Sequence, residues 1–243
     1  MTGDRPHLVL FPGAGSFGSE FQALRSTAGP DSTVLRYPGR GTGEAVSFEA
    51  VVASCADRIA ALPAGRVVLL GHSYGAYLAY ATALALDRRP VDVSLLMVAG
   101  ASAPDLLRVP PEATESPKAA AAYLDAVDPG QMAAAAPEWR DAVAETVQQD
   151  LRVLAGLTLP SPPARVSCPV VGLRGTGDPL TSDASLAGWR RFTRRDFDPR
   201  TFDGGHSDLL GDPGLIALVH EELTRGTAGV HPSDHRTTDP SPR

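Results

Sequence analysis

The chain has 243 residues, of which 43% are hydrophobic and 21% charged, and its formal net charge is −6. This composition is ordinary for a globular protein and is sufficient for one large α/β domain. The sequence has no basic run that would neutralise a phosphate backbone, and no apolar stretch approaches the roughly 20 residues that span a bilayer, so we expect neither a nucleic-acid nor a membrane partner.

The chain enters its first expected strand without an apolar leader, so we expect a cytoplasmic protein. Its two cysteines, Cys55 and Cys168, lie far apart and lack metal-ligand spacing. We expect both to be buried structural thiols.

The first quarter of the sequence predicts strands at 7–11 and 34–37 and helices at 19–27 and 47–62, the second helix capped by Ser47. The glycine-rich loop at 12–18 lacks the lysine and the spacing of a nucleotide-binding loop. Its backbone N–H groups are better suited to face a developing oxyanion.

Residues 66–75 contain the central motif. Four consecutive apolar residues, 67–70, indicate a strand buried on both faces, and the next five residues fit G-x-S-x-G around Ser73. An unbroken helical stretch follows at 76–86. Strand, tight turn and helix form the context of a nucleophile elbow, so we predict that Ser73 is a nucleophile; the alternative is a plain glycine-rich turn. His72 is expected to point to the other side of the turn as a packing residue.

The second half predicts strands at 91–98, 169–174 and 195–202 and helices at 186–192 and 213–223. Between 104 and 163 the strand pattern stops, and alanine-rich helices are expected at 117–127, 129–135 and 137–157. We interpret this insertion as a lid over the active site; the alternative is additional scaffold helices. The prediction is therefore one α/β domain over 1–225, with a mostly parallel sheet covered on both faces. The polar segment 226–243 is predicted to be a disordered tail.

A nucleophilic serine needs a base and an acid that orients it. Of six histidines, His206 alone follows a strand end in a Gly-Gly loop near the C-terminus, and Asp178 follows the penultimate expected strand. These positions fit the order Ser, acid, His. Asp203 and Asp208 are too close in sequence to His206 to be the first choice, and Asp183 is expected to cap the following helix.

The oxyanion hole would use two backbone N–H groups. We assign these to Tyr74, directly after the nucleophile, and to Ala14 in the first loop.

Together these stretches resemble the type II thioesterases that accompany modular polyketide and nonribosomal peptide synthetases, members of the α/β-hydrolase superfamily. The resemblance covers roughly residues 7–223. It is carried by Phe11-Pro12-Gly13-Ala14-Gly15, Tyr37-Pro38-Gly39-Arg40-Gly41, Gly71-His72-Ser73-Tyr74-Gly75-Ala76, Gln149-Asp150-Leu151, Cys168-Pro169-Val170, Asp178-Pro179 and Gly204-Gly205-His206. The sequence departs from that pattern at Tyr74, where methionine is more usual, at Ser16, where a glycine is usual, and at Ser207, where a large aromatic residue is usual.

The resemblance implies hydrolysis of acyl groups from the phosphopantetheine arm of a carrier protein, with no metal or organic cofactor. Ser73 would attack the thioester, His206 would take its proton and Asp178 would fix the imidazole. Carrier proteins are acidic, so Arg40, Arg108 and Arg140 are considered as docking residues. We expect the protein to be a monomer.

Three other interpretations remain open. The same triad would serve a thioesterase that releases or cyclises a finished product, or a general small-ester hydrolase. A non-catalytic binding protein on a hydrolase scaffold would normally lack a triad member, and none is missing here.

Overall fold

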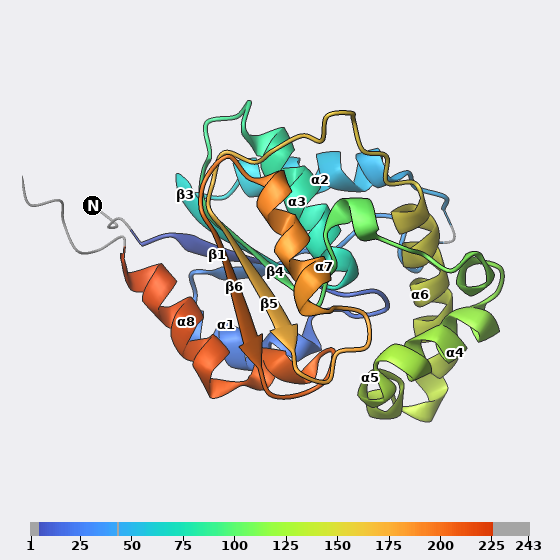
Figure 1. Ribbon diagram of the computed structural model, residues 1–243. Helices are drawn as coiled ribbons and strands as arrows, with labels where there is room; N and C mark the ends of the chain where they lie inside the picture. Colours follow the sequence, from blue (N-terminus) through green and yellow to red (C-terminus); the bar gives the residue numbers. More distant parts are fainter. Residues whose placement is uncertain (1–4, 43, 226–243) are drawn as a thin grey trace, which may run out of the picture.

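The computed structural model describes residues 5–42 and 44–225, and within these residues six parallel strands form one sheet in the order β2-β1-β3-β4-β5-β6 (Figure 1). The strands are β1 His7–Phe11, β2 Ser32–Val34, β3 Arg66–His72, β4 Asp92–Ala99, β5 Val170–Gly175 and β6 Phe197–Phe202. The prediction of a mostly parallel α/β sheet is confirmed. The predicted tail at 226–243 lies outside the described residues.

Helices cover both faces of the sheet. Their bounds are α1 Gln22–Ala28, α2 Phe48–Ala60, α3 Tyr74–Leu86, α4 Pro117–Val127, α5 Pro129–Ala134, α6 Arg140–Ala155, α7 Asp183–Ala187 and α8 Pro213–Thr224. Short 3-10 helices occur at η1 Ser19–Phe21, η2 Pro104–Leu106, η3 Pro111–Thr114, η4 Pro137–Trp139, η5 Gly188–Phe192 and η6 Asp208–Gly211. Helices α2, α3 and α7 lie on one face, and α1 and α8 on the other (Figure 1).

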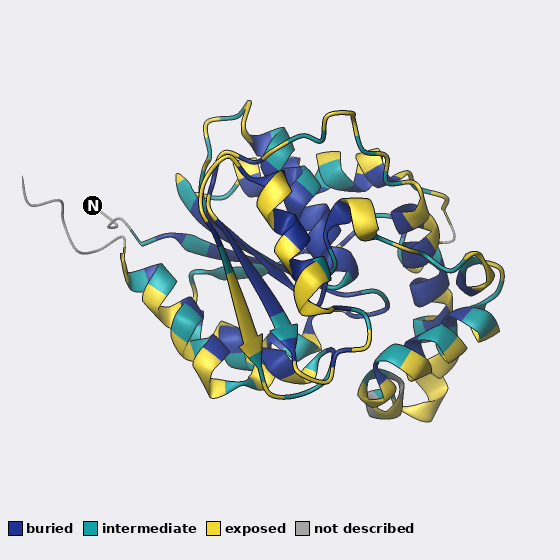
Figure 2. Ribbon diagram, in the orientation of Figure 1, coloured by how far each residue is buried: buried dark blue, intermediate teal, exposed yellow. Residues whose placement is uncertain are grey.

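The central strand β3 shows why the sheet is buried on both faces. Val67 and Leu69 pack into the core under α2 and α3, whereas Val68 and Leu70 pack into the core under α1 and α8. All four are essentially inaccessible to solvent, and Figure 2 shows the middle of the sheet as the buried centre of the molecule. An uninterrupted apolar run is the pattern that a strand between two helical layers requires.

The prediction of the second strand needs adjustment. The second strand is Ser32–Val34 and not 34–37. Leu35 and Tyr37 are buried because they pack into the core and because the Tyr37 hydroxyl donates to the Pro12 carbonyl at 3.0 Å. At α2 the prediction is correct, since the Ser47 hydroxyl accepts the Ala50 N–H at 3.2 Å.

Helices α4, α5 and α6 all lie between β4 and β5 in sequence and stand together beside the sheet (Figure 1). Helices η3, α4 and α6 share a small apolar cluster of Ala113, Ala120, Leu124, Val147 and Leu151. We refer to α4, α5 and α6 as the lid helices. The cluster also contacts Ala14 in the loop after β1, so the lid helices pack against the carboxyl edge of the sheet.

Both cysteines are buried and unpaired, as predicted. Burial raises the pKa of the Cys55 and Cys168 thiols to about 12. Neither therefore provides a thiolate near neutral pH. Among the described residues, no helix is long and apolar enough to cross a membrane.

Candidate active site

Ser73 occupies the sharp turn between β3 and α3. Among the described residues it is the only one other than glycine with a positive φ, at 53°. An added Cβ on Gly71 would lie 2.3 Å from the Gly75 carbonyl oxygen, and one on Gly75 would lie 2.1 Å from the Phe11 carbonyl oxygen. The turn therefore needs both glycines, and its strained serine has the backbone geometry of a nucleophile elbow.

His206 and Asp178 meet although 28 residues separate them. Nδ1 of His206 lies 3.0 Å from Oδ1 of Asp178, and both side chains are buried. The same carboxylate oxygen accepts the Leu180 N–H at 2.8 Å. Burial raises the pKa of the Asp178 carboxyl, but the hydrogen bond and charge of His206 and the Leu180 N–H outweigh it, so the pKa lies below its usual value. An ionised Asp178 accepts the hydrogen bond of the Nδ1–H of His206, which leaves Nε2 as the nitrogen that can act as a base.

The competing acids are occupied elsewhere. The Asp208 carboxylate accepts the Gly205 N–H at 2.9 Å, within its own loop. Asp183 pairs with Arg174. Asp183 is also not the cap of α7, because the Ser182 hydroxyl accepts the helix N–H. That part of the sequence interpretation is wrong by one residue.

The competing histidines lie away from Ser73. His7 is on β1 and bonds through Nε2 to the Thr33 hydroxyl at 2.8 Å. His220 is exposed on α8. His231 and His235 lie outside the described residues.

Ser73 and His206 open into one cavity of about 360 Å³ at the carboxyl edge of the sheet. Ala14 and Tyr74 line it as well. Much of the remaining wall comes from the loop after β4 and the lid helices, and the segment after β5 adds Pro179, Leu180, Ser182 and Ser185. The residues from the first two sources include Ser102, Leu107, Arg108, Val109, Tyr123, Leu124, Val127, Gln131, Val147, Leu151 and Leu154. The lid helices therefore contribute part of the cavity wall at this edge, and their action as a lid stays a prediction.

The two backbone groups assigned to the oxyanion hole are available. In the described part of the chain, neither the Ala14 N–H nor the Tyr74 N–H has a hydrogen-bond acceptor. The N–H groups on either side of Ala14 are bonded: Gly13 donates to Glu20 at 3.3 Å and Gly15 to Asp150 at 2.9 Å. The close approach of the elbow to the end of β1 brings the two free groups to the same cavity.

His72 has a role that sequence reasoning missed. Its Nε2 donates to the His206 carbonyl oxygen at 3.0 Å, and the two rings lie 4.8 Å apart between centroids. Burial, together with the charge of His206, lowers the pKa of His72 to about 3, so the ring is neutral. His72 therefore supports the His206 loop through this hydrogen bond and is more than a packing residue. Its place beside Ser73 is the only hint of this in the sequence.

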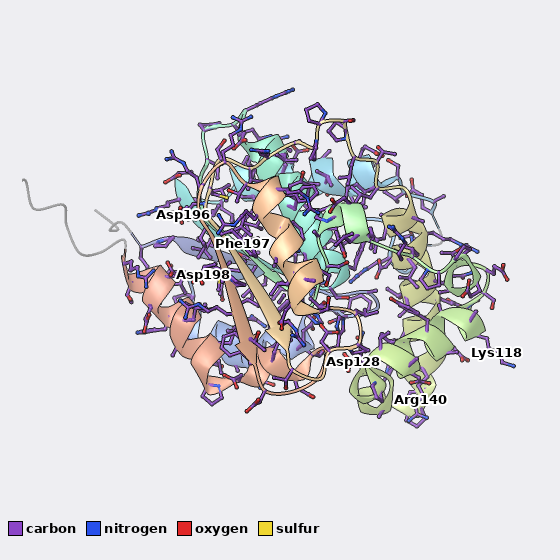
Figure 3. All side chains as sticks on the ribbon, viewed as in Figure 1. Lys118, Asp128, Arg140, Asp196, Phe197 and Asp198 are labelled. Atoms are coloured by element: carbon purple, nitrogen blue, oxygen red, sulfur yellow. The ribbon has the colours of Figure 1, made fainter. Side chains whose placement is uncertain are left out.

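One of the three arginines considered for docking is excluded. The Arg40 side chain is only 5% exposed because it is paired with Asp150 on α6. Arg108 is exposed and lines the cavity. Arg140 is exposed at the start of α6, on the outer side of the lid helices (Figure 3).

Ser16 and Ser207, at which the sequence departs from the family pattern, both make polar contacts. The Ser16 hydroxyl donates to Glu20 and accepts the Gly18 N–H at 3.0 Å, which closes the loop after β1. The Ser207 hydroxyl donates to Asp128, which lies between α4 and α5 on the side of the lid that faces the catalytic loops (Figure 3). A hydrogen bond therefore joins the His206 loop to the lid helices at Ser207.

Known thioesterases resemble the protein in sequence and in fold. The protein is 28% identical over 237 residues to the thioesterase TesA of Mycobacterium leprae, covering 92% of this chain and 88% of that protein. It is 30% identical over 211 residues to the thioesterase PikA5 of Streptomyces venezuelae, covering 82% and 74%. Its fold matches RedJ, a thioesterase from the prodiginine biosynthetic pathway in Streptomyces coelicolor, with a TM-score of 0.74, 27% identity and coverage of 90% and 84%.

The family model of the thioesterase domain matches residues 6–223. This span runs from the start of β1 to the last turn of α8 and includes the lid helices. Sequence, fold and the motif around the elbow therefore agree on one assignment: the chain belongs to the thioesterase family.

Proposed function

We propose that this protein is a serine thioesterase in which Ser73 is the nucleophile, His206 the general base and Asp178 the residue that orients it. The main support is a single cavity that contains Ser73, the His206 ring bonded to Asp178, and the free N–H groups of Ala14 and Tyr74. These are the parts that acyl transfer to a serine requires.

In the first half-reaction, Ser73 Oγ attacks the thioester carbonyl carbon while His206 Nε2 takes the hydroxyl proton. The carbonyl oxygen becomes an oxyanion and accepts hydrogen bonds from the Ala14 and Tyr74 N–H groups. Collapse of this intermediate breaks the carbon–sulfur bond, and the sulfur leaves as a thiol with the proton from His206. Asp178 holds the imidazole and balances its transient positive charge.

In the second half-reaction, water attacks the acyl group on Ser73 and gives a proton to His206. The second oxyanion forms at the same two N–H groups. Its collapse releases the carboxylic acid, and the proton returns to Ser73. In each half-reaction His206 accepts one proton and gives one back, so the proton balance closes without a metal or organic cofactor.

We further propose that the thioester is an acyl group on the phosphopantetheine arm of a carrier protein, and that the enzyme clears such arms in polyketide or nonribosomal peptide synthesis. The similarity to PikA5 and to RedJ of the prodiginine pathway supports this substrate class. Arg108, exposed at the cavity, offers a positive charge to an acidic carrier protein. We place this activity in the cytoplasm and assign it to the monomer.

The test is mass spectrometry of carrier proteins loaded with a panel of acyl groups, before and after incubation with the enzyme. We expect release of several short acyl groups by the native protein and none by Ser73→Ala. Ser26→Ala, on the exposed side of α1, is the matched control and should retain full activity. Turnover of one elaborate acyl chain alone would indicate product release instead of clearing, and full activity of Ser73→Ala would end the assignment.

A further inference from the structure

A buried ion pair lies behind the loop that follows β1. Arg40 donates from Nε to Oδ1 of Asp150 at 3.0 Å and from Nη2 to Oδ2 at 2.6 Å. The two side chains are 5% and 3% exposed. The guanidinium also lies 4.5 Å from the centroid of the Tyr37 ring. Two charges removed from water persist only when further groups complete their hydrogen bonds, and here those groups belong to the loop that carries Ala14.

The first peptide unit of this loop is held by Arg40. Its Nη2 donates to the Gly13 carbonyl at 3.2 Å, and its Nη1 donates to the Ser16 carbonyl. The Gly13 carbonyl and the Ala14 N–H are the two ends of one planar trans peptide unit, so they point in opposite directions. By fixing the oxygen, Arg40 also fixes the direction of the N–H that is proposed to meet the oxyanion.

The second peptide unit is held at both ends by the lid helices. Gln131 on α5 donates to the Ala14 carbonyl at 2.8 Å, and Asp150 on α6 accepts the Gly15 N–H at 2.9 Å. Gly15 has a φ of +71°, and a Cβ there would lie 2.3 Å from a methyl carbon of Val147. The loop therefore rests directly on α6, and its shape depends on where that helix sits.

We propose that Arg40, Asp150 and Gln131 are positioning residues that aim the Ala14 N–H at the reacting carbonyl oxygen. The oxyanion site is then complete only when α5 and α6 are seated on the loop, which makes the seating of the lid a condition for acyl transfer. This inference rests on the proposed function. None of the three side chains takes a proton or forms a bond in the reaction; they act through the Ala14 peptide.

The test uses three variants. Arg40→Lys keeps the positive charge beside Asp150 but loses the planar fork that reaches the Gly13 and Ser16 carbonyls. Asp150→Asn removes the negative charge of the Arg40–Asp150 ion pair, a charge that lies on α6. Gln131→Leu removes only the half-buried donor to Ala14 and leaves the ion pair intact. Arg191→Lys is the matched control, because Arg191 pairs with Asp105 and has no contact with the loop.

Two rates are measured for each variant at a temperature where circular dichroism shows it folded. One is hydrolysis of a soluble acyl-N-acetylcysteamine thioester, resolved into kcat and KM. The other is phosphonylation of Ser73 by an alkyl fluorophosphonate, which needs the same oxyanion site but no natural substrate. Loss of one oxyanion donor costs about 10²–10³ in kcat. Because the Ala14 N–H is no longer held in its direction in Arg40→Lys and Asp150→Asn, kcat and the phosphonylation rate should each fall at least about tenfold. We expect a smaller loss in Gln131→Leu and KM within about twofold in all three variants.

The inference would be overturned if folded Arg40→Lys kept the native kcat and phosphonylation rate. If neither Arg40→Lys nor Asp150→Asn folds, unchanged rates in Gln131→Leu would overturn it instead. A rise in KM without a fall in kcat would also overturn it, because that pattern indicates a binding role. The proposed function is judged separately by the native protein. If that protein is phosphonylated at Ser73 but hydrolyses no acyl thioester, the proposed function fails while the ratio of phosphonylation rates still decides the inference. Native protein that is not labelled at Ser73 would contradict both.

Discussion

The buried His72 predicts how the stability of the fold depends on pH. Its pKa is about 3 in the folded protein, against 6.5 for an unperturbed histidine. Since the folded pKa is the lower one, the unfolded chain takes up the proton first as the pH falls. The contribution of His72 to stability is therefore fully present above pH 6.5 and is lost progressively as the pH falls towards 3.

The magnitude follows from the two pKa values. One pKa unit corresponds to about 1.4 kcal/mol, so lowering the pH from 7 to 4.5 should remove about 2–3 kcal/mol of unfolding free energy through His72 alone. Total stabilities are about 5–15 kcal/mol, so the change is large enough to measure. The variant His72→Gln keeps an N–H donor for the His206 carbonyl but has no proton to gain.

The assay is urea denaturation of the native protein and of His72→Gln at both pH values. We expect the loss of unfolding free energy between pH 7 and 4.5 to be about 2–3 kcal/mol smaller in the variant. His220→Gln, on the exposed face of α8, should keep the pH dependence of the native protein. Equal losses in the native protein and in His72→Gln would refute the reasoning, since His72 would then not be a buried neutral ring.

Three further predictions concern the active site. Asp178→Asn should lower kcat by about 10⁴-fold with little change in the circular dichroism spectrum of the folded protein. The control Asp208→Asn should lower kcat less than about tenfold. If Asp208→Asn lost more activity than Asp178→Asn, the orienting acid would be Asp208. Gly75→Ala would put a methyl group 2.1 Å from the Phe11 carbonyl oxygen, so urea titration should reveal a loss of more than about 2 kcal/mol, and a stable, active variant would contradict the packing at the elbow. Arg108→Glu should lower kcat/KM for an acyl carrier protein at least about threefold more than for a small thioester; equal effects would remove Arg108 from docking.

Much of the architecture can be predicted from the sequence because its signals are local. The apolar run at 67–70, the glycines beside Ser73 and the cap at Ser47 each specify structure within a few residues. The pairing of His206 with Asp178 could be predicted because both follow strand ends, and parallel strands bring their carboxyl ends to one edge. The order of elements was sufficient for that prediction.

The parts that sequence could not predict depend on contacts across long separations. Nothing near Arg40 indicates that its partner is Asp150, 110 residues away, and an arginine in a turn-rich loop is normally exposed. The same limitation applies to His72, which meets the His206 carbonyl across 134 residues. Buried polar pairs of this kind appear only when the packing of separate elements is known.

The central claim is that the acyl group passes through Ser73, and trapping the acyl-enzyme tests it most directly. Native protein is mixed with an acyl-loaded carrier protein, quenched with acid within the first turnover, digested and analysed by mass spectrometry. We predict the mass of the acyl group on the peptide that contains Ser73, and no such adduct in Ser73→Ala. An acyl group found on another residue, or hydrolysis by Ser73→Ala at the native rate, would contradict the account.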